Sequence, residues 1–156
     1  MSMGETIDLE EQYDKIYRYC YFRIHSRETA EDITQETFLR FLENKNYRDR
    51  GKSLQYLYTI AGNLCVDEYR KKQTEELTEE VIIEDGSDKL LTNMALREAL
   101  AEFSHEEREL LLLRFVNEVP FAVICSLTGE SRFALYRKIN KLLKRLREKL
   151  REEDFS

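Results

Sequence analysis

The chain has 156 residues, of which 42% are apolar, 36% are charged and one is proline, and its net charge is −6. This length suits one domain or two small ones, and the apolar content excludes a wholly disordered chain. There is no apolar run long enough to span a membrane and no secretory signal at the start, so we expect a cytoplasmic protein without membrane insertion.

The composition favours helices throughout, because glycine and proline are rare and Leu, Glu, Lys and Arg are frequent. Only residues 81–85, VIIED, look like a strand, and this segment is too short and isolated to form a sheet. Cys20, Cys65 and Cys125 lie far apart without a CxxC pair, which favours buried free thiols over disulfides or a metal site. The sequence therefore predicts an all-α fold made of two small helical domains joined by an acidic linker.

The first predicted domain, residues 1–72, contains three amphipathic helices. Apolar residues recur at steps of three and four over three ranges, about 7–25, 26–44 and 53–72. Ser26 can cap the second of these helices, which extends to about Asn44. In the second helix we expect Leu42 to face the core with Ile33, Phe38 and Phe41. Its polar side carries Asp32, Gln35, Glu36 and Arg40. The exposed side of the third helix carries Tyr56, Thr59, Asn63, Arg70 and Lys71.

The middle of the chain holds the whole charge imbalance. Residues 73–93 contain seven acidic groups and one basic group, whereas the segments on either side are nearly neutral. This stretch lacks a sustained helical stripe, so we interpret it as a linker, although a solvated charge run alone would look the same.

The last predicted domain, residues 94–156, has the pattern of a helix-turn-helix. Ser104 and Glu107 have capping-box spacing, and the helix that they open, through LLLLRFVNE, is apolar on most sides and should be buried. Pro120 can start a short helix, and Gly129 suits the turn after it. A longer helix then begins near Ser131, with nine basic residues and one acidic residue up to Arg151. Its apolar residues recur at helical spacing and form one stripe, made of Leu135, Ile139, Leu142, Leu143, Leu146 and Leu150. Such a helix suits a polyanion, although an antiparallel helical hairpin with a basic surface would give a similar pattern.

The side chains expected to meet DNA lie on one side of this last helix. Arginine can pair with guanine edges and asparagine with adenine edges, while lysines further along can neutralise phosphates. The candidate residues are Ser131, Arg132, Phe133, Tyr136, Arg137, Asn140, Lys141 and Lys144.

Both halves of the chain resemble a known family. AEDITQETFLRFLE at 30–43 resembles region 2.2 of bacterial RNA polymerase sigma factors, and YLYTIAGNLCVDEYRKK at 56–72 resembles the helix of regions 2.3 and 2.4. Residues 103–150 resemble region 4. With regions 2 and 4 alone and a short linker, the chain is similar to the extracytoplasmic-function group.

This resemblance implies a function and a set of partners. A sigma factor binds core RNA polymerase and directs it to promoter DNA for transcription initiation, and it has no cofactor or metal. It implies that Asp32, Gln35, Glu36 and Arg40 bind the core enzyme. An anti-sigma factor is a further partner to be considered.

The resemblance also assigns the two DNA-contacting faces. Tyr56, Thr59, Asn63, Arg70 and Lys71 would contact the melted minus-ten element, and the residues from Ser131 to Lys144 would read the minus-thirty-five element. Three positions depart from the family pattern. Tyr56 stands where the family usually has tryptophan, Gly62 stands where arginine is common, and Phe133 stands where a small residue is common.

Other classes of protein fit the sequence less well. An enzyme is disfavoured because His25 and His105 lie in different halves and no phosphate-binding glycine loop or nucleophile elbow is present. A sigma-like regulator or adaptor that does not initiate transcription remains open. A repressor that uses only the C-terminal helix-turn-helix would leave residues 30–43 without a role.

Overall fold

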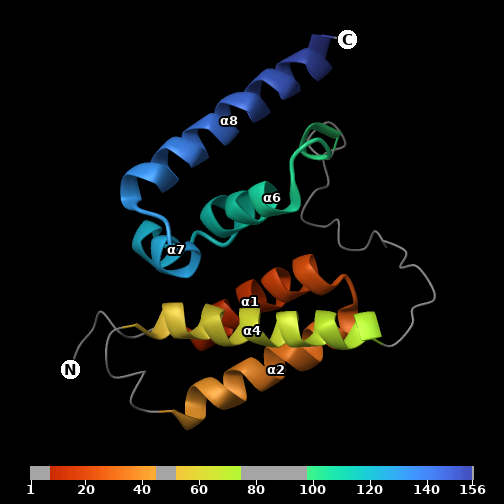
Figure 1. Ribbon diagram of the computed structural model, residues 1–156, viewed down its shortest axis with the longest axis vertical. Coiled ribbons are helices and arrows are strands. Elements are labelled where there is room, and N and C mark those ends of the chain that lie inside the picture. The colour runs from red at the N-terminus through yellow and green to blue at the C-terminus, as the bar shows by residue number, and fades with distance from the viewer. Residues whose placement is uncertain (1–7, 45–51, 75–97, 156) are drawn as a thin grey trace. The chain divides into compact units, whose positions relative to one another are not determined.

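The computed structural model describes residues 8–44, 52–74 and 98–155, and the described chain is mainly helical without strands, which confirms the all-α prediction (Figure 1). The chain divides into two compact units, residues 1–83 and 84–156. The strand-like segment 81–85 and nearly all of the predicted linker lie outside the described residues, so the linker remains a prediction. None of the helices in the described ranges is long and apolar enough to cross a membrane.

Three helices pack against one another in the N-terminal unit. They are α1 (Leu9–Ile24), α2 (Arg27–Glu43) and α4 (Ser53–Thr74). Ser26 caps α2 as the sequence predicts, because its hydroxyl accepts a hydrogen bond from the N–H of Thr29 at 3.3 Å. His25 ends α1 in the left-handed conformation, with φ of 63°, so the chain turns sharply between α1 and α2.

Apolar side chains from all three helices form the core of this unit. Its fully buried members include Ile16, Cys20, Ala30, Leu57, Tyr58 and Ala61. The hydroxyls of Thr34 and Thr37 are also buried, and each donates to a carbonyl oxygen one turn earlier in α2, at 2.7 Å. The buried side of α2 thus includes Thr34 and Thr37 but not Leu42, whose side chain is 45% exposed, so the prediction for Leu42 was wrong.

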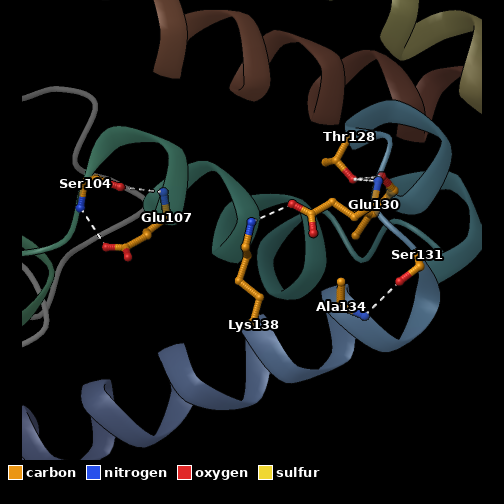
Figure 2. Close-up of polar contacts among 8 residues, drawn as sticks. Ser104, Glu107, Thr128, Glu130, Ser131, Ala134 and Lys138 are labelled. Atoms are coloured by element: carbon orange, nitrogen blue, oxygen red, sulfur yellow. Dashed lines mark hydrogen bonds and ion pairs between the residues drawn. The ribbon is translucent and has the colours of Figure 1, made fainter.

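The predicted capping box opens the first helix of the helix-turn-helix region in the C-terminal unit. The elements that follow are α6 (His105–Leu111), the wider π-helical turn η3 (Leu112–Val116) and α7 (Phe121–Thr128). Ser104 N–H donates to the Glu107 carboxylate at 2.9 Å, and Glu107 N–H donates to the Ser104 hydroxyl at 3.1 Å (Figure 2). Residues 110–113 are all buried as expected.

A wider turn ends this buried helix earlier than the apolar run suggests. The N–H of Asn117 donates to the carbonyl of Leu112, five residues before it, at 2.8 Å. Phe115 and Val116 are consequently exposed. The sequence therefore predicted the burial of the leucines correctly but overestimated the buried length.

The long helix α8 (Arg132–Phe155) packs on both α6 and α7. Leu135, Ile139 and Leu142 form its buried stripe, as predicted from their spacing. One turn further, the Arg145 guanidinium donates to Glu107 at 3.2 Å and lies 4.3 Å from the centroid of the Phe103 ring. Arg145 thus joins the middle of α8 to the start of α6.

The contacts of the Glu107 carboxylate with the Ser104 N–H and with Arg145 should stabilise the folded state measurably. The hydrogen bond from the Ser104 N–H, together with Arg145, holds the pKa of Glu107 below its ordinary value of 4.5. Because the pKa is lower in the folded state, ionised Glu107 stabilises the fold fully at pH values above the ordinary pKa. This stabilisation is lost as the pH falls through the lower pKa of the folded state. We expect Glu107→Ala to lower the free energy of unfolding by about 1 kcal/mol at pH 7.

The neighbouring Glu106 provides the matched control. It lies in the same first turn and is exposed, and Glu106→Ala removes the same charge without removing a capping bond. Glu107→Gln should cost less than Glu107→Ala, because its amide oxygen can still accept from Ser104. Urea unfolding of the full chain, followed by circular dichroism, measures all three variants. Equal destabilisation by alanine at 106 and 107 would contradict this account.

Candidate nucleic-acid interface

The turn between α7 and α8 is fixed by a short set of polar contacts. Gly129 ends α7 with φ of 78°, a conformation that side-chain-bearing residues rarely adopt. The Glu130 N–H donates to the Thr128 hydroxyl at 3.3 Å, and the Ala134 N–H donates to the Ser131 hydroxyl at 3.1 Å (Figure 2). The arrangement is therefore a helix-turn-helix with a capped second helix, as the sequence predicts.

The predicted DNA-contacting side chains of α8 share one property, which is exposure. All eight are exposed. Ser131 precedes α8 and Arg132 lies over the Phe121 ring at its start, while the other six lie on the sides of α8 away from its buried stripe: Phe133, Tyr136, Arg137, Asn140, Lys141 and Lys144. On a helix of 3.6 residues per turn, Phe133, Arg137, Asn140 and Lys144 recur at steps of three and four and so form one continuous face. This face could enter a groove without disturbing the core.

Some of the basic side chains of α8 form ion pairs within the C-terminal unit. Within the described residues, three of its basic side chains form ion pairs with acidic groups outside α8. Lys138 pairs with Glu130 at 2.5 Å (Figure 2), and Arg145 and Lys149 pair with Glu107 and Glu102. Simple charge counting therefore overstates the charge that α8 can present to a polyanion.

Aromatic and arginine side chains gather at the start of α8. Phe121, Arg132, Phe133 and Tyr136 line a hollow of about 430 Å³ whose exposed walls are almost entirely apolar. The guanidinium carbons of Arg114 and Arg132 lie 5.2 and 5.8 Å from the centroid of the Phe121 ring. Arg114 and Phe121 were not predicted as candidate residues, because neither belongs to the basic helix.

The exposed face of α4 includes most, but not all, of its predicted residues. Thr59, Asn63 and Arg70 are exposed and follow one another at helical spacing, and Lys71 is exposed beside them. Tyr56 is only half-exposed, since its ring packs 5.9 Å from that of Phe41 on α2. The structure therefore brings Tyr56 to the edge of this face, where one part of the ring belongs to the helix contact.

Gly62 lies where α4 approaches α1. A β-carbon at this position would lie 3.4 Å from the Tyr19 hydroxyl and 3.5 Å from the guanidinium of Arg23. Arg23 donates to that hydroxyl at 3.0 Å. A positive charge from α1 therefore stands next to Gly62, and an arginine in place of Gly62 would meet a like charge there.

The polar face of α2 is more mixed than the sequence analysis assumed. Asp32, Gln35 and Arg40 are exposed, and Arg40 donates to the half-exposed Glu36 at 2.8 Å. Leu39, which is 58% exposed, and Leu42 share this face. This face therefore combines two exposed leucines with charged side chains and an amide.

The three cysteines differ in their burial. Cys20 and Cys65 are buried and not in disulfides, and a hydrogen bond from Cys65 lowers the pKa of the Cys20 thiol. Cys125 is only half-buried, so the prediction of a buried thiol was wrong there. Across the described ranges, no group of three His, Cys, Asp or Glu side chains could hold a metal ion.

Comparison with known proteins gives matches over both units. Residues 9–75 match the Sigma-70 region 2 family. The chain is 32% identical to the ECF RNA polymerase sigma factor BldN of Streptomyces coelicolor over 155 residues, covering 88% of this chain and 59% of BldN. It is 27% identical to the ECF RNA polymerase sigma factor SigW of Bacillus subtilis over 158 residues, covering 89% and 84% of the two chains. The chain thus spans less than two thirds of the length of BldN.

A solved structure shares the fold. The sigma factor RpoE of Bartonella quintana, crystallised in complex with the anti-sigma factor NepR, is similar with a TM-score of 0.65 and 20% identity. The similarity covers 89% of this chain and 91% of RpoE.

Proposed function

We propose that this chain, which belongs to the extracytoplasmic-function group of sigma factors, binds core RNA polymerase in the cytoplasm and directs it to promoters. The observation that carries this proposal is that one chain combines a region 2 match with a helix-turn-helix whose basic face is exposed. A repressor that uses only the helix-turn-helix would leave residues 9–75 without a role. The expected anti-sigma partner remains a prediction.

The exposed face of α2 is our candidate for the surface that binds core polymerase. Asp32, Gln35, Glu36 and Arg40 supply charged and hydrogen-bonding groups, and Leu39 adds an apolar contact that is solvated in the free chain. Burial of Leu39 against a partner would contribute roughly 1–2 kcal/mol, so this leucine strengthens the proposal based on the polar residues.

Charge reversal on α2 tests this surface. Asp32 is exposed, so we expect Asp32→Lys to leave folding unchanged and to weaken binding of core polymerase about tenfold, which corresponds to about 1.4 kcal/mol. The matched control is Asp14→Lys, because Asp14 is an exposed aspartate on another helix and the change in net charge is the same. Titration of labelled chain with purified core polymerase measures both, and equal affinities for the two variants would contradict the assignment.

The two other faces are candidates for contact with the promoter. On α4, Thr59, Asn63, Arg70 and Lys71, with the edge of Tyr56, would contact the melted minus-ten strand, because amide, aromatic and cationic groups suit unstacked bases and phosphates. On α8, the face from Ser131 to Lys144 would read the minus-thirty-five element as duplex in the major groove.

Substitutions on α8 should separate sequence reading from electrostatic attraction. Lys144→Ala should weaken binding to all duplexes similarly and reduce the slope of the salt dependence by about one, because a phosphate contact carries no sequence information. Arg137→Ala or Asn140→Ala should instead change which duplex is preferred, by about 1–3 kcal/mol. Selection from a random duplex pool with the full chain, at two salt concentrations, distinguishes these effects. If Arg137→Ala behaved like Lys144→Ala, the face would be only an electrostatic surface.

A further inference from the structure

Phe133 is the most exposed of the large apolar side chains that line the hollow at the start of α8. Its side chain is 74% exposed and that of Tyr136, one turn later, is 58% exposed. Both line the hollow together with Phe121 and Arg132. A phenylalanine left in water on the first turn of a capped helix gains nothing in the free protein, since burial of its ring is what would contribute free energy.

The neighbours of Phe133 indicate a nucleic-acid occupant for this surface. Arg137 and Asn140 lie one and two turns further along the same face, and Lys141 and Lys144 follow them, all exposed. Arg132 lines the apolar hollow and lies over its Phe121 wall, and further exposed cations follow along α8. An apolar group carried by a polyanion fits this combination better than an apolar protein surface does.

The major groove of duplex DNA offers one apolar group on its base edges, the C5 methyl of thymine. Side chains in the first turns of a second helix of this kind are those that meet base edges. We infer that Phe133 packs on a thymine methyl group, with Tyr136 beside it, and so makes thymine the preferred base at one position of the duplex. This inference rests on the proposed function, because it names the base specificity of the α8 face.

Replacing thymine by deoxyuridine tests the contact, because it removes only the methyl group and keeps the pairing edge. The duplex selected by the full chain from a random pool is synthesised with each thymine replaced in turn. For the wild-type chain, one replacement should weaken binding about fourfold, as expected for one buried methyl group. Phe133→Ala should lose this sensitivity, and Phe133→Leu should keep most of it, because leucine retains an apolar contact.

Phe115→Ala provides the matched control. Phe115 is also an exposed phenylalanine of the C-terminal unit, but it does not line the hollow. This variant should respond to deoxyuridine as the wild type does. Circular dichroism of each variant confirms that the helices are intact.

Two results would overturn the inference without touching the proposed function. One is a selected duplex in which no deoxyuridine replacement weakens wild-type binding. The other is a Phe133→Ala chain that keeps its sensitivity to deoxyuridine but loses affinity for core polymerase, which would assign the hollow to a protein partner. Failure of the full chain to select any sequence would instead contradict DNA reading by α8 as a whole, and the inference with it.

Discussion

The buried stripe of α8 is the constraint on which the C-terminal unit depends. Leu135, Ile139 and Leu142 hold the helix on α6 and α7, so the rotation of α8 about its own axis is fixed by packing. That rotation decides which side chains remain in water. Because the exposed face contains Phe133, Arg137, Asn140 and Lys144, the same hydrophobic contact that folds the unit also presents its candidate DNA-reading surface.

Positive charge in α8 has two separate uses. Arg145 stabilises the fold, since it contacts both Glu107 and the ring of Phe103, and Lys138 helps to fix the turn through Glu130. Such exposed pairs contribute little each, but they keep these cations close to the protein. Arg137, Lys141 and Lys144 are exposed, and they are the cations that the proposed function assigns to phosphates and bases. A count of basic residues cannot make this division, whereas the three-dimensional contacts make it directly.

Local signals in the sequence predicted much of the structure. The caps at Ser26 and Ser104 and the left-handed Gly129 depend on contacts within a few residues, so spacing and residue type suffice. The stripe of α8 follows from helical periodicity, which the sequence also shows. The failures involve longer range or unusual geometry. Leu42 was misassigned because the buried side of α2 includes two threonines whose hydroxyls bond within the helix, and Phe115 is exposed in the π-helical turn. The hollow could not be foreseen, because Phe121 joins α8 only through the folded turn.

The central claim is that one chain couples a polymerase-binding unit to a promoter-reading unit. Transcription in vitro from a random promoter library, with purified core polymerase and the full chain, tests it most directly. We predict transcripts from a subset of templates that share two separated sequence elements, and no such transcripts from core polymerase alone. Binding of the chain to polymerase and to DNA without any template-selective transcript would contradict the claim and would favour a sigma-like adaptor.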